Sequence, residues 1–558
     1  MRPRGPKASS KPGSRSCRPD AEENPLEPVQ IGDKALAIES LVAVARGGAR
    51  VELADSALQR VARARALVEK WVQEGRAVYG VTTGFGALCE VAIASSETRV
   101  LQENILMSHA AGVGSPFPAE VVRAAAVVRV QDLSQGHAGV KPETLRALVD
   151  LLNSGICPVV PEKGSVGASG DLAPMAHLAL VLIGQGEAFY RGTRMSGSEA
   201  LSAAGLAPVR LDAGEGLALI NGTQFMAGIG ALAVSDAARL ARTADIACSI
   251  SLEVLMGTNV EFDPRIHKAR PHPGQAAVAD NMHRITQDSA IMSSHKDCHR
   301  IQDAYTLRCS PQVHGASRDA ISHVRGVFET ELASCTTNPL VFPETGDFLL
   351  GGNFHGQPLA LAADYLCMAA SELASISERR IERLVNPQLS GLPAFLVNDS
   401  GLNSGFMIAQ YTAAALVSEN KVLSHPACVD SIPTSANKED HVSMGTISVR
   451  KCRSVIANAE AVIAVELLCG CQALDLLTKG RPGRGTEAAY RIVRQRVPRL
   501  DRDRVLSRDI EAMVDLLRDG AIIRAVEEAV GPIPCSPPYA WSFGTLPGLS
   551  PGDGTAWR

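Results

Sequence analysis

The sequence predicts a mainly α-helical protein. Only 4% of its 558 residues are aromatic, and many segments are rich in Ala, Leu and Glu. Such a composition favours helices over strands. Two long segments, 361–374 and 407–417, carry apolar residues at helical spacing on both sides of a helix. We therefore expect long helices buried in a bundle, within a chain large enough to hold several subdomains.

Five consecutive segments are predicted along the chain. The first is basic and rich in Pro, Gly and Ser, and the last is again rich in Pro and Gly, so both are predicted to be loose tails. Between them, a region of short helices mixed with glycine loops holds both Tyr79 and the Ala168-Ser169-Gly170 turn and is therefore predicted to be the catalytic subdomain. Long helices and a helical cap follow it. The expected segments are a tail at 1–32, an N-terminal catalytic subdomain at 33–211, a central bundle at 212–480, a C-terminal cap at 481–534 and a tail at 535–558.

Charge and cysteine usage favour a cytoplasmic enzyme that acts on a small molecule. The net charge is −4 with both signs interspersed, so we expect neither a nucleic-acid groove nor a surface for anionic membranes. The most apolar stretch, 455–477, is interrupted by Glu460, Glu466 and Asp475, which is typical of a buried helix rather than a membrane span. Thirteen scattered cysteines and no signal-peptide core favour free thiols in a reducing cytoplasm.

The most informative motif is Ala168-Ser169-Gly170, because this tripeptide can cyclise into an electrophile. If the Gly170 nitrogen attacks the Ala168 carbonyl and two water molecules leave, Ser169 becomes an exocyclic methylidene on an imidazolone ring. Glycine reaches the tight backbone conformation easily, and alanine allows close approach. No ordinary side chain supplies such an electrophile.

The residues around this tripeptide predict a loop followed by a helix. Asp171 and Pro174 precede an apolar run at 175–183, which Gly184 closes, so we expect an N-terminal acid, an early proline and a terminal glycine. The N-terminus of that helix would favour negative charge on the loop. A serine-hydrolase elbow would need glycine in place of Asp171, and a P-loop would need a Gly-Lys-Ser/Thr ending.

From about residue 33 to residue 534, the chain resembles the aromatic amino acid ammonia-lyases that carry a methylidene-imidazolone group. The resemblance implies an aspartase-like fold with a long central helical bundle, assembled as a homotetramer whose active sites draw residues from more than one subunit. It rests on motifs at 79–86, 108–112, 167–174, 221–224, 302–313, 352–355 and 435–444.

Among these enzymes, the histidine-deaminating members are the most similar. They imply conversion of L-histidine to trans-urocanate and ammonium, the first step of histidine degradation, through a methylidene-imidazolone formed from Ala168, Ser169 and Gly170. The β proton is weakly acidic and ammonia leaves poorly, so the reaction needs an electrophile, a base and charge stabilisation in a dry pocket.

Two polar residues match the family's positions at the reacting atoms. Tyr79 matches the catalytic base, although a phenol titrates near pH 10 and needs N–H donors or positive charge to act as one. Outside its motif, a tyrosine before glycine would simply pack at a turn. Asn221 matches the asparagine beside the prosthetic group and the substrate carboxylate.

Four further residues match positions of the family's site: Tyr305 is expected to be catalytic, and the other three are expected to bind substrate. Arg308 matches the residue that holds the substrate carboxylate in a bidentate contact, although a surface ion pair would be its reading outside the motif. Gln302, Tyr305 and Arg308 recur every third residue, so a helix would place them on one broad face. Phe354 matches a pocket wall, and an ordinary core position is the alternative.

Substrate choice is predicted to depend on His109 and Glu439, which match the residues that hold imidazole in histidine-specific members. A buried carboxylate accepts the imidazole N–H and would be left unpaired against a benzene ring. Without its motif, Glu439 would be interpreted as a surface acid. Lys438 stands where these enzymes usually have glutamine, and it brings a positive charge next to Glu439.

Several alternatives remain open on the sequence alone. A phenylalanine or tyrosine ammonia-lyase and an aromatic or histidine 2,3-aminomutase would use the same electrophile, and a non-catalytic helical scaffold is the more distant rival. The intact tripeptide, Tyr79 and Arg308 argue against the scaffold. His295, Cys298 and His299 lie close together, but the zinc-protease spacing is not met, so no metal is predicted.

Overall fold

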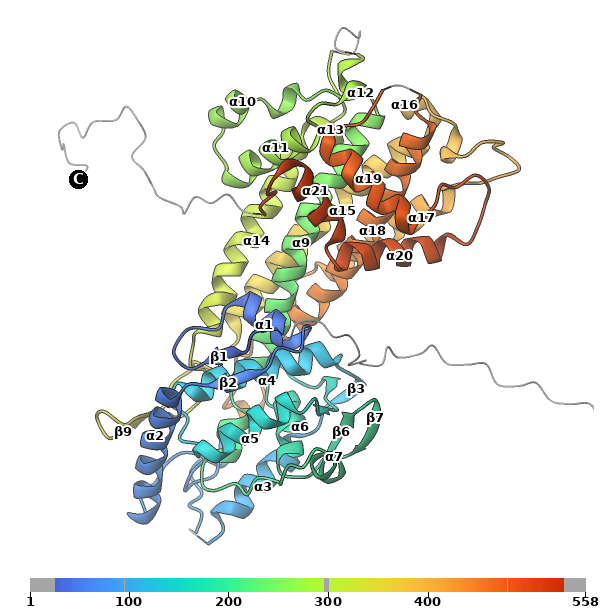
Figure 1. Ribbon diagram of the computed structural model, residues 1–558. Coiled ribbons are helices and arrows are strands. Elements are labelled where there is room, and N and C mark those ends of the chain that lie inside the picture. The colour runs from blue at the N-terminus through green and yellow to red at the C-terminus, as the bar shows by residue number, and fades with distance from the viewer. Residues whose placement is uncertain (1–25, 95, 296–300, 479, 536–558) are drawn as a thin grey trace, which may run out of the picture. The chain divides into compact units, whose positions relative to one another are not determined.

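Helices dominate the computed structural model, which describes residues 26–535 apart from 95, 296–300 and 479 (Figure 1). The strands are short, and those in the described ranges form four small sheets. The predicted mainly α fold is confirmed. Most of the two predicted tails lies outside the described residues. Val29–Ile31 nevertheless form strand β1, paired in parallel with β2 (Val51–Leu53), so regular structure begins before the predicted boundary at residue 33. This pairing buries Ile31.

The chain divides into two compact units that do not follow sequence order. The first unit contains the described residues up to 235, together with 324–365 and 425–453; the second contains 236–323, 366–424 and the described residues from 454 onward. Three long helices, α9, α15 and α18, begin in the first unit and end in the second. The five consecutive segments expected from the sequence therefore stay a prediction.

The first unit combines helices with all four small sheets. Strands β4, β6 and β7 form one antiparallel sheet, and β3–β5 and β8–β9 form antiparallel pairs. Besides β1 and β2, its elements are α1 (Ile38–Ala45), α2 (Asp55–Gln73), η1 (Gly86–Leu88), α3 (Thr98–His109), β3 (Val113–Pro116), α4 (Ala119–Ser134), α5 (Pro142–Asn153), β4 (Cys157–Pro158), β5 (Pro161–Lys163), α6 (Ala173–Leu182), β6 (Glu187–Tyr190), β7 (Thr193–Ser196), α7 (Gly197–Ala203), α8 (Glu215–Ile220), β8 (Leu340–Phe342), β9 (Asp347–Leu349) and η4 (Ser435–Asn437).

In its described residues, the second unit has helices and the loops between them, and no strand. Its elements, with the long helices that enter or leave it, are α9 (Gln224–Val254), η2 (Val260–Phe262), α10 (Pro264–Ala269), α11 (Pro273–Ile285), α12 (Ala290–Ser293), α13 (Tyr305–Arg308), α14 (Ser310–Leu332), α15 (Gln357–Val385), α16 (Pro387–Ser390), η3 (Ala394–Leu396), α17 (Met407–Leu423), α18 (Gly445–Leu476), α19 (Arg484–Arg496), α20 (Leu506–Arg518) and α21 (Ala521–Val530).

Buried ion pairs tie four of these helices together in the second unit. Arg318 of α14 donates to Asp245 of α9, which also contacts His314 at 2.9 Å, and Arg380 of α15 binds Glu466 of α18. All five side chains are fully buried. Removing one partner from such a pair costs about 3–5 kcal/mol because the other charge stays buried.

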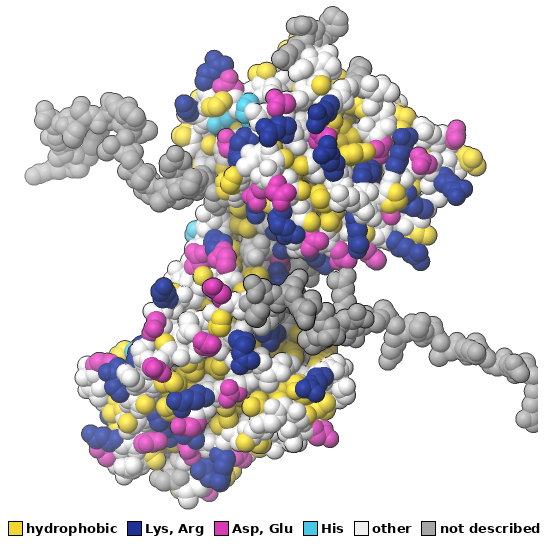
Figure 2. Space-filling model, in the orientation of Figure 1, with side chains coloured by type: hydrophobic (Ala, Val, Ile, Leu, Met, Phe, Trp, Pro, Cys, Tyr) yellow, Lys and Arg dark blue, Asp and Glu magenta, His cyan; other side chains and the backbone are white. Residues whose placement is uncertain are grey.

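Helices α15 and α18 are apolar and long enough to cross a membrane by length and composition. However, 67% and 78% of their most apolar windows are buried inside the protein, which is typical of core helices. Helix α18 includes most of the stretch 455–477 that the sequence predicted as a buried bundle helix. On the face drawn in Figure 2, basic and acidic side chains are interspersed rather than gathered by sign.

Candidate active site

The Ala168-Ser169-Gly170 loop is clamped against the segment that joins α8 to α9. The Gly222 N–H donates to the Ser169 carbonyl at 3.2 Å, and the Asp171 N–H donates to the Gly222 carbonyl at 2.7 Å. Gly170 has a φ of +78°, and a Cβ added to it would lie 1.9 Å from the Gly222 oxygen. Glycine is therefore required at residue 170 by both its conformation and its close approach.

Helix α6 begins two residues after the tripeptide, as predicted, but Asp171 does not cap it. Its carboxylate instead accepts the N–H groups of Phe225 and Met226 in the first turn of α9. Burial raises the pKa of Asp171 to about 7, although these N–H groups and the charge of Arg129 oppose the rise. The expected local cap is thus replaced by a contact with a residue 54 positions away.

Glu439 lies beside the serine that would cyclise. Its Oε1 accepts the Ser169 hydroxyl at 2.9 Å, and its Oε2 accepts the Thr434 hydroxyl at 2.6 Å. The turn before it, Ser435–Asn437, has three consecutive residues with positive φ. Such non-glycine conformations cost about 1–3 kcal/mol each and cluster at functional sites. The Glu439 side chain is half-buried and directly follows this strained turn, whereas the Lys438 side chain is exposed.

His109, the last residue of α3, faces the same place. Its ring is half-buried and packs edge-on against Phe85, with centroids 5.4 Å apart. Burial lowers the pKa of His109, which the charge of Glu439 only partly opposes, so the imidazole is neutral at neutral pH. Its Nδ1 lies 3.1 Å from the Ser108 hydroxyl.

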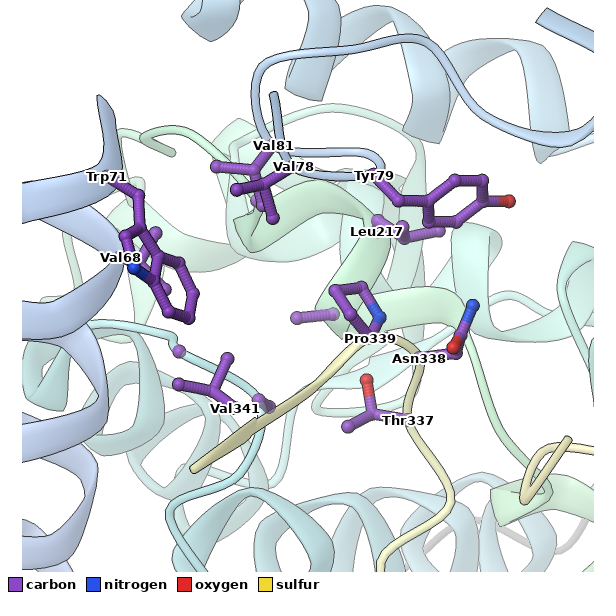
Figure 3. Close-up of a pocket in the computed structure, with 14 residues that line it drawn as sticks. Val68, Trp71, Val78, Tyr79, Val81, Leu217, Thr337, Asn338, Pro339 and Val341 are labelled. Atoms are coloured by element: carbon purple, nitrogen blue, oxygen red, sulfur yellow. The ribbon is translucent and has the colours of Figure 1, made fainter. Parts of the chain in front are cut away.

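Tyr79 is held at the edge of an apolar core. Figure 3 shows its ring beside Leu217, with the hydroxyl directed away from Trp71 and Val341. Gly80 permits this packing, because a Cβ there would lie 2.3 Å from Leu217. The core thereby fixes the ring and leaves the hydroxyl free to face polar groups.

The Tyr79 hydroxyl accepts the Gly86 N–H at 2.9 Å, the kind of donor that a phenolate needs. Burial nevertheless raises the pKa of Tyr79; the Gly86 N–H opposes the rise, and the charge of Glu439 adds to it. Gly86 also approaches Ser435, since a Cβ on Gly86 would lie 2.8 Å from the Ser435 hydroxyl. Tyr79 and the Glu439 turn are therefore neighbours.

The pKa of Tyr79 predicts a pH dependence. A base must be deprotonated to act, and a pKa raised above its ordinary value of 10 leaves the phenolate fraction growing with pH throughout the neutral range. We expect kcat/KM to rise steadily between about pH 7 and about pH 9. A rate profile measured with the enzyme stable at each pH checks this, and a flat profile over that range would contradict it.

A cavity of about 260 Å³ opens over the Ala168-Ser169-Gly170 loop. It is lined by the two ends of the tripeptide and by His109 and Glu439, the two residues predicted to set substrate choice. The lining residues are Ser108, His109, Ala111, Gly164, Ser165, Val166, Gly167, Ala168, Gly170, Asp171, Leu172, Ala173, Thr434 and Glu439. The structure thus brings Ala168, Ser169, Gly170, His109 and Glu439 together.

Asn221 lies directly before the segment that clamps the loop. Its side chain is buried, and its Oδ1 has no hydrogen-bond partner. A buried amide oxygen without a partner is costly and points to a missing donor. An imidazolone built from residues 168–170 fits the close approach of Gly170 to Gly222, where only glycine has room. Such a ring carries no N–H group, so the Asn221 oxygen stays available to accept a hydrogen bond from another donor.

Gln302, Tyr305 and Arg308 belong to the second unit. Helix α13 covers only Tyr305–Arg308, so the expectation of one helical face fails for Gln302: the backbone of Ala304 is extended, with ψ of 151°. Gln302 and Arg308 nevertheless line one cavity of about 810 Å³. The Arg308 guanidinium lies 4.6 Å over the Tyr305 ring, and its Nε has no hydrogen-bond partner.

The remaining predicted positions are less informative. Phe354 is half-buried between β9 and α15 and is not among the residues lining either cavity described above. His295 contacts the carbonyls of Ile291 and Gly257 at 2.9 and 2.8 Å, whereas Cys298 and His299 lie outside the described residues. Within the described part of the chain, no group of three metal-ligating side chains is present.

Three residues at the site escaped the sequence reasoning. Gly222 clamps the tripeptide, Thr434 anchors Glu439, and His177 of α6 accepts the Gly112 N–H at 3.1 Å, three residues after His109. Gly222 directly follows the predicted Asn221, and a glycine at this place is a signal that another backbone segment approaches closely. For Thr434 and His177, the sequence offered no local signal, because their partners are distant or lie on loops.

Comparison with known proteins identifies the family of the chain. The family model for aromatic amino acid lyases matches residues 36–495. The chain belongs to this family. It is 57% identical over 498 residues to a histidine ammonia-lyase of Gloeobacter violaceus, a match that covers 89% of this chain and 97% of that protein. Its identity to a histidine ammonia-lyase of Symbiobacterium thermophilum is 56% over 508 residues, covering 91% and 100%.

Solved structures of this lyase family share the fold. A histidine ammonia-lyase from Trypanosoma cruzi superposes with a TM-score of 0.83 at 44% identity, over 90% of this chain and 95% of that chain. A tyrosine aminomutase from Streptomyces globisporus gives 0.86 at 38% identity, over 90% and 99%. A phenylalanine ammonia-lyase from Rhodosporidium toruloides, at 20% identity and a TM-score of 0.80, supports the fold alone.

Proposed function

We propose that this member of the aromatic amino acid lyases is a histidine ammonia-lyase. It converts L-histidine to trans-urocanate and ammonium with a methylidene-imidazolone formed from Ala168, Ser169 and Gly170. The observation that carries the proposal is the 2.9 Å contact between the Glu439 carboxylate and the Ser169 hydroxyl, in a cavity that His109 also lines. It brings an imidazole acceptor next to the electrophile.

Recognition of histidine follows from the charges at this place. The Glu439 carboxylate accepts an imidazole N–H of the substrate. His109 is neutral, so its own ring offers a nitrogen as a second hydrogen-bonding partner for the substrate imidazole. A benzene or phenol ring would leave the Glu439 carboxylate without its partner, which costs more than a lost apolar contact. Histidine is therefore favoured over phenylalanine.

The elimination breaks two bonds of the substrate, Cβ–H and Cα–N, so it needs a base for the β proton and an electrophile that helps ammonia leave. When formed, the imidazolone supplies an electrophilic methylidene to the substrate. The 221–222 segment would hold this ring, with the Asn221 side chain beside it. Tyr79 takes the β proton on its hydroxyl oxygen, where the Gly86 N–H stabilises the phenolate. Its site on a rigid apolar core keeps this oxygen oriented.

Arg308 binds the substrate carboxylate, with Gln302 and Tyr305 beside it. The enzyme is a homotetramer, and these three residues of one subunit complete the cavity of another. Arg308 has an unused Nε for this purpose. Exposed apolar side chains along α15, at Leu361, Tyr365 and Met368, favour association of copies. The described cysteines are all free, which favours a reducing compartment such as the cytoplasm.

Product analysis tests this proposal. Purified protein is incubated with L-histidine, L-phenylalanine and L-tyrosine, and the ultraviolet absorbance of the conjugated acids is followed while ammonium is measured. We expect urocanate and ammonium in equal amounts from histidine, and a far slower reaction with the other two. A β-amino acid without free ammonium would instead identify an aminomutase, the activity of a structural relative at 38% identity. Cinnamate formed faster than urocanate would show an aromatic lyase.

Glu439→Gln tests the basis of substrate choice. The change keeps the shape but removes the charge that the imidazole N–H meets, and a hydrogen bond to a charged group contributes about 1.5–3 kcal/mol. Because the loss of this energy lowers the rate in proportion, we expect kcat/KM for histidine to fall about 10- to 100-fold. Asp440→Asn is the matched control, because this neighbouring acid is exposed. Equal losses in both variants would contradict the assignment.

A further inference from the structure

The backbone around the cyclising tripeptide is positioned by a buried polar cluster that none of the proposed catalytic steps uses. Arg129 of α4 is fully buried, and its Nη2 donates to the Asn221 carbonyl at 2.6 Å and to the Gln224 side chain. Its Nη1 pairs with Asp132 at 3.0 Å. Asn221 and Gln224 bracket Gly222, so this guanidinium fixes the segment that touches the tripeptide.

A second layer of contacts closes this cluster. The Gln224 amide donates to Asp132 at 2.7 Å and to the Thr336 hydroxyl at 2.9 Å, and Thr336 also accepts the Thr223 N–H at 3.4 Å. Residues 221–224 are therefore held by Arg129, Asp132 and Thr336, through hydrogen bonds to the Asn221 carbonyl, the Thr223 N–H and the Gln224 side chain. A fork of several donors is a function that arginine performs and lysine does not.

The cluster matters because Gly222 sets the position of Gly170. Its N–H binds the Ser169 carbonyl and its carbonyl binds the Asp171 N–H, one on each side of the nitrogen that must attack. Contact is so close that a Cβ on Gly170 would clash with the Gly222 oxygen at 1.9 Å. Any shift of residues 221–223 would therefore move the Gly170 nitrogen relative to the Ala168 carbonyl.

We propose that Arg129 is a positioning residue for the autocatalytic formation of the prosthetic group, held in place by Asp132. A buried ion pair often contributes no more stability than apolar residues of the same volume, so its presence beneath this loop is better explained by orientation. This inference rests on the proposed function, because it needs the tripeptide to cyclise.

The step that Arg129 serves is balanced within the chain. The Gly170 nitrogen bonds to the Ala168 carbonyl carbon. One water leaves with the Ala168 oxygen and the protons of the Gly170 and Ser169 amides, which creates a C=N bond. The second water leaves with the Ser169 hydroxyl and its Cα proton, which creates the C=C bond. No oxidant or further reactant is needed.

Mass spectrometry of newly made chains tests this role. Arg129→Lys keeps the positive charge beside Asp132 but cannot reach both the Asn221 carbonyl and Gln224. We expect the folded variant to lose its two water molecules at least about 10-fold more slowly than the wild type, as the loss of one charge-assisted hydrogen bond implies. Arg318→Lys is the matched control, because Arg318 is equally buried and ion-paired in the second unit. It should be destabilised yet cyclise at the wild-type rate.

A second variant covers the case in which Arg129→Lys does not fold. Thr336→Val is nearly isosteric and removes the acceptor of the Thr223 N–H and of the Gln224 amide. It should slow cyclisation in the same direction. If folded Arg129→Lys cyclised at the wild-type rate, the role of Arg129 alone would be overturned. If Arg129→Lys did not fold, Thr336→Val that cyclised at the wild-type rate would overturn it in the same way. A wild-type chain that never loses water would overturn the proposed function together with it.

Discussion

Ser169→Ala is expected to abolish turnover, lowering kcat by at least about 10⁴-fold, because the whole reaction depends on one electrophile. Alanine has no hydroxyl to leave, so the methylidene cannot form. The Ser169 hydroxyl donates to the Glu439 carboxylate at 2.9 Å, at the edge of the cavity, so we expect its removal to leave the fold intact. Steady-state assays with histidine, together with the mass of the chain, check this result.

The control for this variant is Ser154→Ala. Ser154 caps the end of α5 in the same unit and donates to the Leu151 carbonyl, away from the cavity. It should retain wild-type turnover and the mass of the cyclised chain. Appreciable turnover by folded Ser169→Ala would show that another group supplies the electrophile, or that none is needed.

Tyr79→Phe is expected to lower kcat/KM by about 10²- to 10⁴-fold, the range typical of losing a positioned general base. Phenylalanine keeps the packing against Leu217 and removes only the oxygen that accepts the Gly86 N–H. Cyclisation does not involve Tyr79 in this account, so the variant should still lose two water molecules. The combination of a normal mass and a lost rate separates a base from a maturation residue.

Tyr190→Phe provides the comparison for the base. Tyr190 is a buried tyrosine of β6 in the same unit, and it is not among the residues that line the cavity. Its loss should leave kcat/KM within about twofold of wild type, in keeping with a change of well under 1 kcal/mol. A Tyr79→Phe enzyme that behaved like Tyr190→Phe would remove Tyr79 from the mechanism.

Local sequence signals predicted the helices well. Pro174 and Gly184 bracket α6 as expected, and the apolar stretch at 455–477 lies almost wholly within α18. Such elements depend on residues close together in the chain, which periodicity and end signals report directly. The mainly α fold followed from the same features.

Contacts between distant segments could not be read in this way. Asp171 resembled a local helix cap, yet its carboxylate binds the start of α9, 54 residues away. Gln302 fitted a three-residue repeat, but the extended Ala304 separates it from α13. Of the residues that the motifs singled out, His109 and Glu439 line the cavity beside Ser169, whereas the clamp by Gly222 and the support from Arg129 needed the structure.

The most direct test of the prosthetic group is the mass of the wild-type peptide that contains Ala168, Ser169 and Gly170, measured on protein that turns over histidine. We predict a peptide lighter than its sequence by two water molecules, whereas the Ser169→Ala peptide keeps its full mass. An active wild-type enzyme whose peptide has the mass of the unmodified sequence would contradict this prediction, because the electrophile would then have another origin.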